Sequence, residues 1–191
     1  MPQLEVNSQP ILLLVSGMPA SGKSTLAEQL ARELQVPFFT KDGIKELLFD
    51  AEDVEMSQMD EETSERLGAQ AMTVLYDIAQ RILDANGSLL LEANFRAQLA
   101  RTQIEPFLSQ AIVRQVACHV PVEQVVQRFE ERQSGHERHP VHAEVDDTQH
   151  LAEDLQRKDY GPIPDLPTLL VDTSDGFDPS LAEIARFCRD G

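Results

Sequence analysis

The chain of 191 residues carries 33 acidic against 16 basic side chains, which gives a net charge of −17 and a pI near 4.5. Such acidity argues against broad binding to nucleic acid, which needs a basic surface to neutralise its phosphates. No apolar run is long enough to span a membrane, and the polar residues 1–9 lack the features of a signal peptide. We therefore expect a cytoplasmic protein with a flexible tail over residues 1–9 and a single domain over residues 10–191.

The two cysteines give no sign of a disulfide or a metal site. Cys118 and Cys188 lie far apart in the sequence and have neither redox nor metal-ligand spacing. Cys118 sits in an apolar segment that predicts a strand. We expect both to be free thiols in a reducing compartment.

A phosphate-binding motif organises the first part of the chain. Residues 17–25 read GMPASGKST and match the Walker A pattern G-x-x-x-x-G-K-[ST]. An apolar run at 11–15 predicts a buried strand before the motif, and leucines at helical spacing predict a helix at 25–34 after it. Strand, loop and helix in this order form an anion nest at a helix N-terminus. The predicted nucleotide-binding residues here are Gly17, Met18, Pro19, Ala20, Ser21, Gly22, Lys23, Ser24 and Thr25.

Two of these side chains have predicted chemical roles. Lys23 would contact the β- and γ-phosphates of a nucleoside triphosphate, and Ser24 would offer its hydroxyl to Mg²⁺. The sequence therefore predicts binding of a nucleoside triphosphate with magnesium.

A carboxylate follows the second predicted strand, at residues 36–40. Asp42 lies just past the end of this strand, where parallel sheets bind ligands, although it could equally cap the helix that runs from Lys41 through Phe49. Residues 50–62 then form an acidic connection with seven acids and no Lys or Arg. This connection is expected to be a solvated segment. If it faced the site, it would disfavour an anionic acceptor and tolerate a cationic one.

A second carboxylate ends the third predicted strand. A long amphipathic helix over residues 63–85 precedes the apolar strand at 88–91, and Glu92 follows directly. An acidic residue at this point is typical of a Walker B carboxylate, which orders Mg²⁺ through water or touches the acceptor. The alternative is an edge carboxylate with a local hydrogen bond.

The second half of the chain continues the alternation of helices and strands. It predicts a helix at 97–110 that Pro106 kinks or divides, a strand at 113–120, a helix that starts at Pro121, a further helix at 150–157, a strand at 168–172 and a closing helix at 179–189. Five parallel strands alternating with helices predict a three-layer α/β/α domain.

Arginines cluster near a polar, turn-rich segment at about residues 133–145. Arg128 and Arg132 are one helical turn apart and can point the same way, and Arg138 lies within the segment. We expect this segment to be a mobile lid that closes over the triphosphate and excludes water. Its histidines 136, 139 and 142 lack a fixed metal-ligand spacing across Pro140, which argues against a structural metal.

The combined motifs resemble those of small P-loop kinases. Residues 17–25, Lys41 to Lys45, Glu92 to Phe95 and the arginine-bearing lid make the chain similar to the AAA-type predicted kinases. More distant relatives by this resemblance are polynucleotide kinase, chloramphenicol phosphotransferase and zeta toxins. The resemblance implies the sheet order 2-3-1-4-5, with ATP at the carboxyl ends of the strands.

The resemblance also implies roles for the acceptor side. Asp42 would be the general base on the acceptor hydroxyl, and Lys45 would occupy the place of an arginine that binds the acceptor phosphate in polynucleotide kinases. Lysine offers a point charge instead of a bidentate fork, so the sequence departs from the pattern there. The predicted substrate-binding residues are Asp42, Lys45, Glu92, Asn94 and Arg96, and the predicted catalytic residues are Lys23, Asp42, Arg128 and Arg132; Arg128 and Arg138 would also contact the nucleotide.

These observations predict an ATP- and Mg²⁺-dependent transfer of the γ-phosphate to a hydroxyl of a small molecule. Two alternatives remain open: a nucleotide-binding ATPase or switch module that acts on a protein partner, and a nucleic-acid 5′-end kinase. The acidity of the chain and the lysine at position 45 count against the second. Whether Asp42 or Glu92 is the base also stays open.

Overall fold

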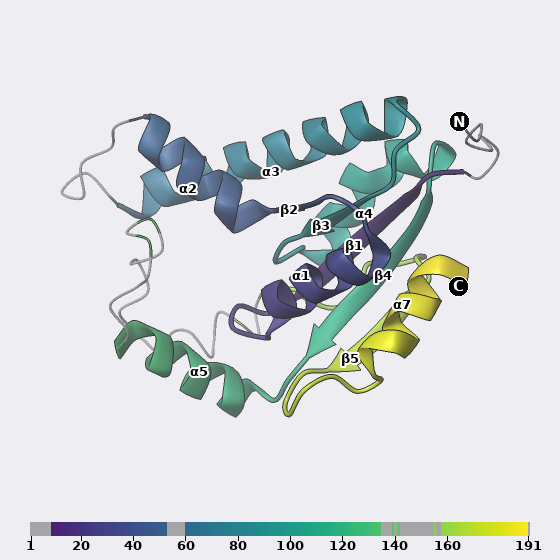
Figure 1. Ribbon diagram of the computed structural model, residues 1–191. Helices are drawn as coiled ribbons and strands as arrows, with labels where there is room; N and C mark the ends of the chain where they lie inside the picture. Colours follow the sequence, from purple (N-terminus) through teal and green to yellow (C-terminus); the bar gives the residue numbers. More distant parts are fainter. Residues whose placement is uncertain are drawn as a thin grey trace.

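The computed structural model describes residues 9–52, 60–134, 139, 141, 155 and 158–190. In chain order the elements are β1 (Ile11–Gly17), α1 (Lys23–Leu34), β2 (Phe38–Thr40), α2 (Lys41–Ala51), α3 (Glu61–Asp84), β3 (Leu89–Glu92), α4 (Ala97–Ile104), the 3-10 helix η2 (Glu105–Ser109), β4 (Ile112–His119), α5 (Val122–Ser134), β5 (Thr168–Asp172) and α7 (Leu181–Asp190) (Figure 1). None of the described helices is long and apolar enough to cross a bilayer.

The five strands form one parallel sheet in the order β2-β3-β1-β4-β5, which confirms the predicted topology. Because all strands run the same way, their carboxyl ends meet at one edge of the sheet. Thr40 of β2 pairs in register with Glu92 of β3, and Gly17 of β1 pairs with Cys118 of β4. The residues that follow the strands therefore converge on one crevice.

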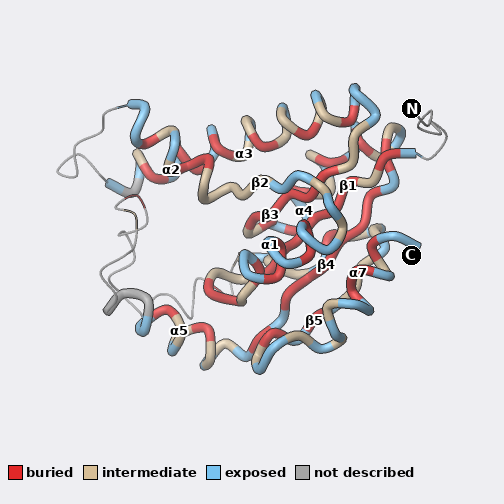
Figure 2. The backbone as a smooth tube through the Cα atoms, in the orientation of Figure 1, coloured by how far each residue is buried: buried red, intermediate tan, exposed pale blue. Residues whose placement is uncertain are grey.

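Alternate side chains of β1 pack on opposite faces of the sheet. Leu12 and Leu14 contact the core beneath α3 and α4, while Leu13 and Val15 contact the core beneath α1 and α7. All four are at most 2% exposed, and each buried side chain of this size contributes about 1.5–3 kcal/mol of hydrophobic free energy. Figure 2 shows the buried strands between two layers of helices with exposed outer sides, so the predicted three-layer α/β/α architecture is confirmed.

Some helices begin or end at other residues than predicted, because a capping glycine and a proline determine their boundaries. Helix α1 begins at Lys23, two residues early, because Gly22 takes a left-handed conformation at the N-cap. Pro106 divides the predicted helix 97–110: α4 ends at Ile104 and the chain continues as η2, since proline cannot donate the helical hydrogen bond. Helix α2 runs two residues beyond Phe49, to Ala51.

The acidic connection contributes structure at its two ends. Asp60 is the N-cap of α3 and accepts a hydrogen bond from Thr63 N at 2.8 Å, and Glu52 forms an ion pair with Arg66 at 2.7 Å. Residues 53–59 lie outside the described part of the chain, as do residues 1–8 of the predicted tail. Most of the predicted lid and of the predicted helix 150–157 also falls outside it.

Both cysteines are buried free thiols, as predicted. Burial raises the pKa of the Cys118 thiol and of the Cys188 thiol to about 12, so both stay protonated near neutral pH.

Candidate active site

The loop between β1 and α1 can close only because of its glycines. A Cβ on Gly17, whose φ is +148°, would lie 2.8 Å from the carbonyl oxygen of Cys118 and 2.7 Å from Ser21 Oγ. Any larger residue would therefore push the loop away from β4. Gly22, at φ +81°, turns the chain into α1, so the first amides of the helix face the same space as the loop.

Glu92 links the loop lysine to the loop serine. Lys23 Nζ lies 3.7 Å from Glu92 Oε1, and Ser24 Oγ donates to Glu92 Oε2 at 3.0 Å. Lys23 is 5% exposed and Glu92 is 2% exposed. Glu92 is therefore more than an edge carboxylate, because both of its contacts are residues of the phosphate-binding motif.

Burial governs the acidity of Glu92. It raises the pKa of the carboxyl above its ordinary value of 4.5, and the negative charge of Asp42 raises it further, while Lys23 and the Ser24 hydrogen bond oppose the shift. A carboxyl with a raised pKa holds its proton more tightly in the folded chain than in the unfolded chain. Its contribution to stability is full below 4.5 and is lost as the pH rises through the folded pKa.

Replacement of Glu92 should remove this loss. We compare the free energy of unfolding of the wild type with that of Glu92→Gln at each pH. The wild-type value should fall relative to the variant as the pH rises, by about 1.4 kcal/mol for each unit by which folding raises the pKa of Glu92. Urea unfolding followed by circular dichroism in metal-free buffer between about pH 5 and 8 measures it. Glu28→Gln, on the exposed face of α1, is the matched control and should show no such trend. Parallel pH curves for wild type and Glu92→Gln would contradict the assignment.

Asp42 enters the crevice from the start of α2. The N-cap of this helix is Thr40, whose Oγ1 accepts a hydrogen bond from Gly43 N at 3.0 Å, so the alternative in which Asp42 provides the cap is wrong. Thr40 is the register partner of Glu92. Asp42 is close enough for its charge to raise the pKa of Glu92. The structure thus brings Asp42, Glu92 and Lys23 to one place.

Arg128 reaches the loop from α5. Its Nη2 donates to the carbonyl oxygens of Thr173 at 2.7 Å and Ser174 at 2.9 Å, and its Nη1 lies 3.8 Å from the position of a Cβ on Gly22. The guanidinium is therefore held beside the phosphate-binding loop. The side chain of Arg132 and the whole of Arg138 lie outside the described residues.

Lys45 is buried between helices. It is 7% exposed, and its Nζ donates to Ser64 Oγ at 2.6 Å and lies 3.4 Å from the carbonyl oxygen of Val141. It thus joins α2 to α3 and to the chain at Val141. Nearby, His139 Nε2 lies 3.2 Å from Asp50 Oδ1. His136 and His142 are outside the described residues.

The remaining predicted residues lie after β3. Asn94 Oδ1 is buried and has no hydrogen-bond partner within the described part of the chain. Arg96 is exposed at the N-cap of α4. Both follow Glu92 closely in the chain, between the end of β3 and the start of α4.

Sequence reasoning missed the contacts of two residues near these side chains. Thr173 is buried after β5, and its Oγ1 lies 2.5 Å from the carbonyl oxygen of Ser21, so it ties the loop to the last strand. Lys41 is the second, and its ammonium lies over α3: a Cβ on Gly68 would lie 3.6 Å from Lys41 Nζ. A lone glycine inside a strong helix was the available signal for a close approach.

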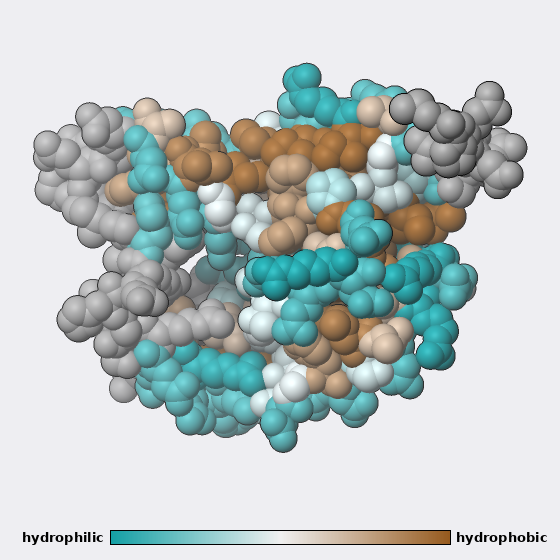
Figure 3. All heavy atoms as spheres, viewed as in Figure 1, coloured by the Kyte–Doolittle hydropathy of each residue, from teal (hydrophilic) through white to brown (hydrophobic). Residues whose placement is uncertain are grey.

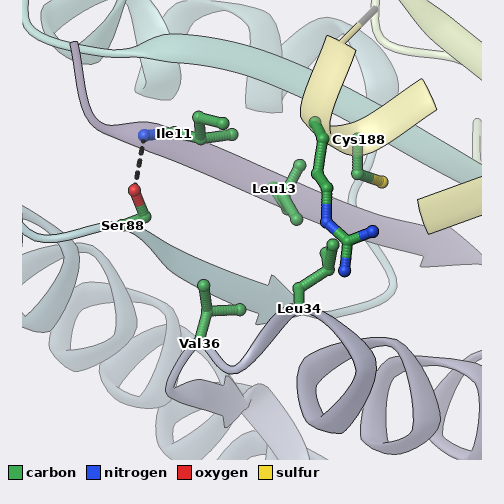
Figure 4. Close-up of a pocket in the computed structure, with 7 residues that line it drawn as sticks. Ile11, Leu13, Leu34, Val36, Ser88 and Cys188 are labelled. Carbon is green, nitrogen blue, oxygen red and sulfur yellow. Dashed lines mark hydrogen bonds between the residues drawn. The ribbon is translucent and has the colours of Figure 1, made fainter. Parts of the chain in front are cut away.

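A separate cavity of about 190 Å³ lies at the other end of the sheet. Figure 4 shows Ile11 and Leu13 of β1 facing Leu34, Val36 and Cys188 across it. Ile11 begins β1, whereas the phosphate-binding loop follows its last residue. This apolar cavity is therefore not the nucleotide site. In the space-filling view the surface is hollowed between α2 and α5, on the side of the loop (Figure 3).

Comparison with known proteins identifies the family and the fold of the chain. A family model described as "AAA domain" matches residues 12–155. The chain is 33% identical to a provisionally assigned kinase from Chloroflexus aurantiacus j-10-fl, over 95% of this chain and 98% of that one, with a TM-score of 0.82. No curated protein matches it.

Two more distant structures share the fold. A gluconokinase from Sinorhizobium meliloti 1021 is 18% identical, over 95% of this chain and 91% of that one, with a TM-score of 0.57. Kti12 from Chaetomium thermophilum, in complex with ADP-AlF3, is 20% identical, over 91% and 95%, with a TM-score of 0.64. The chain belongs to the AAA domain family and has the nucleotide-binding fold of the P-loop kinases.

Proposed function

We propose that this protein is a kinase that transfers the γ-phosphoryl group of ATP to a hydroxyl of a small molecule. The observation that carries the proposal is the convergence of Asp42 with Glu92, which itself contacts both Lys23 and Ser24. A nucleotide-binding loop alone needs only the lysine and serine. A second carboxylate beside them, in the first turn of α2 directly after the neighbouring strand β2, would supply the base that an acceptor hydroxyl requires.

The donor half consists of the loop and its two functional side chains. The loop amides and Lys23 would bind the phosphates, and Ser24 with Glu92 would hold Mg²⁺, Glu92 through water. Their oxygens suit this ion, because Mg²⁺ prefers hydroxyl, carboxylate and water ligands together with phosphates. When bound, the ion neutralises charge on the β- and γ-phosphates.

The acceptor half centres on Asp42. Its carboxylate would orient the acceptor hydroxyl and take its proton as the oxygen forms a bond to the γ-phosphorus. The bond from that phosphorus to the bridging oxygen breaks, and ADP leaves. Such transfer depends mostly on position and charge, so Arg128 beside Gly22, together with Arg132 and Arg138, would stabilise the charge of the transferred group.

Transfer of labelled phosphate tests the proposal. The protein is incubated with γ-labelled ATP, Mg²⁺ and a panel of hydroxylated metabolites and antibiotics, with Lys23→Ala as the blank. We expect label in one small acceptor. Hydrolysis that no acceptor stimulates would instead support an ATPase or switch module. Efficient labelling of a 5′-hydroxyl oligonucleotide would support a nucleic-acid kinase.

A further inference from the structure

We propose that Lys41 and Arg96 form an anion-binding subsite beside Asp42, so that the acceptor is a hydroxy compound that also carries a carboxylate or phosphate. The inference rests on the proposed function, because the anion would belong to the molecule whose hydroxyl meets Asp42. It names the charge class of the acceptor, which neither the fold nor the motif specifies.

Lys41 occupies the acceptor side by virtue of its position in the fold. It is the first residue of α2, directly after the end of β2, and precedes Asp42. Its ammonium extends over Gly68 of α3, where the missing side chain leaves room for it. Arg96 approaches from the other direction, from the loop after β3 at the start of α4. The strand ends that precede them are neighbours, since Thr40 pairs in register with Glu92, and the charge of Arg96 acts on the Lys41 ammonium.

Within the described part of the chain, neither cation has a hydrogen-bonded or ion-paired carboxylate. Among the described residues, none forms a hydrogen bond or an ion pair within 4.0 Å with the Lys41 ammonium or the Arg96 guanidinium. This is unexpected in a chain with 33 carboxylates against 16 Lys and Arg. Surface cations of such a chain would find carboxylates easily, as Arg32, Arg66 and Arg81 do. Two neighbouring cations that no carboxylate of the described residues bonds are therefore a local exception in an acidic chain.

The environment of the Lys41 ammonium disfavours its charged form. Burial lowers the pKa of its ammonium, and the charges of Lys23 and Arg96 lower it further, against the opposing effects of Asp42 and Glu92. A half-buried ammonium that no carboxylate of the described residues bonds directly gains stability when a ligand provides an anion. Such groups in a crevice are typical of functional sites.

The subsite keeps Arg96, which the sequence predicted as substrate-binding, and adds Lys41. Lys45 was expected to face the acceptor, but its ammonium contacts Ser64 and the carbonyl oxygen of Val141. The acidic connection was expected to disfavour an anionic acceptor and tolerate a cationic one if it faced the site, whereas the two cations favour an anionic acceptor. Asn94 Oδ1, buried without a partner among the described residues, lies between Glu92 and Arg96 in the chain and could accept a hydrogen bond from the same ligand.

Lysine labelling tests the subsite without knowledge of the acceptor. Pyridoxal 5′-phosphate and pyridoxal carry the same amine-reactive aldehyde and differ in the phosphate. Each is added to the protein, the imine is reduced with borohydride, and peptides are quantified by mass spectrometry. The chain has only four lysines, at positions 23, 41, 45 and 158. The urea-unfolded protein gives the intrinsic ratio of the two reagents at each lysine.

We expect Lys41 of the folded protein to favour the phosphorylated reagent over pyridoxal by at least about tenfold more than in the unfolded chain. Saturation with Mg²⁺ and a non-hydrolysable ATP analogue should protect Lys23 and leave this preference at Lys41. Equal labelling by the two reagents would overturn the proposal. The proposal would also be overturned if Lys41 lost its preference for the phosphorylated reagent in the presence of the ATP analogue but kept it in the presence of ADP. Lys41 would then bind the γ-phosphate of the nucleotide.

Variants and competitors complete the test. Arg96→Gln should lower the preference at Lys41 several-fold, whereas Arg101→Gln, which removes a paired cation from the same helix, should leave it unchanged. Protection by inorganic phosphate or by acetate, at constant ionic strength, tells the two anion chemistries apart.

Failure of phosphoryl transfer with the labelling preference retained would reject the kinase and keep an anion site. Transfer only to neutral or cationic acceptors would keep the kinase and reject the anion-binding subsite.

Discussion

Lys23→Ala is expected to lower kcat/KM for ATP turnover by at least about 1,000-fold, equivalent to about 4 kcal/mol of transition-state stabilisation. The ammonium is 5% exposed and points from the loop toward Glu92. In such a dry site a positive charge stabilises developing phosphate charge far more than it would in water. Water cannot replace the lysine at this depth.

Arg32→Ala is the matched control for this variant. It removes a positive charge from the same helix, but from a side chain that is 75% exposed and paired with Glu28. Turnover of the control should stay within about twofold of the wild type, because exposed pairs contribute little. Circular dichroism and thermal unfolding confirm that each variant is folded. Turnover of Lys23→Ala within tenfold of the wild type would place the reaction elsewhere.

The donor half of the site was predictable from the sequence because local chain order determines it. Residues 17–25 specify a loop between a strand and a helix, and the loop can only sit at the carboxyl end of β1. Glu92 was predictable for the same reason, since it ends a buried strand of a parallel sheet. The alternation of strands and helices then determines which edge of the sheet collects these residues.

The acceptor half was not predictable, because packing between two helices decides it. Lys41 and Lys45 are four residues apart on α2, so they share a helix face and sequence spacing cannot rank them. Their neighbours on α3 are also four residues apart: Gly68 leaves space for Lys41, and Ser64 binds Lys45. Which lysine is buried against α3 and which stays half-exposed thus depends on how α3 is aligned against α2. Only the folded chain contains that alignment.

The arginines illustrate another limit of sequence reasoning. Arg128 was predicted to contact the nucleotide from its spacing with Arg132, and it does lie beside Gly22. Its position, however, is set by the carbonyl oxygens of Thr173 and Ser174, which come from the far end of the chain. These backbone acceptors have no signature in the sequence. The same holds for Thr173, whose hydroxyl meets the carbonyl oxygen of Ser21.

Asp42→Asn is expected to lower the rate of phosphoryl transfer by about 100- to 10,000-fold, the usual contribution of a general base. Affinity for ATP should change by less than about threefold, because the donor half is formed by the loop, Ser24 and Glu92. The amide has nearly the same shape as the carboxylate but cannot take the hydroxyl proton. Transfer to the acceptor is measured under single-turnover conditions, and ATP binding is measured separately by calorimetry.

Loss of a helix cap would not explain a lower transfer rate in Asp42→Asn. Thr40, rather than Asp42, caps α2 through its bond to Gly43 N, so Asp42→Asn leaves the start of the helix intact. Asp77→Asn, on the exposed face of α3 where Asp77 pairs with Arg81, is the control for an equal change of charge and should transfer at the wild-type rate. If Asp42→Asn retains full transfer, Glu92 becomes the remaining carboxylate for the base. Its raised pKa and its contact with Lys23 then predict a transfer rate that rises with pH as Glu92 ionises.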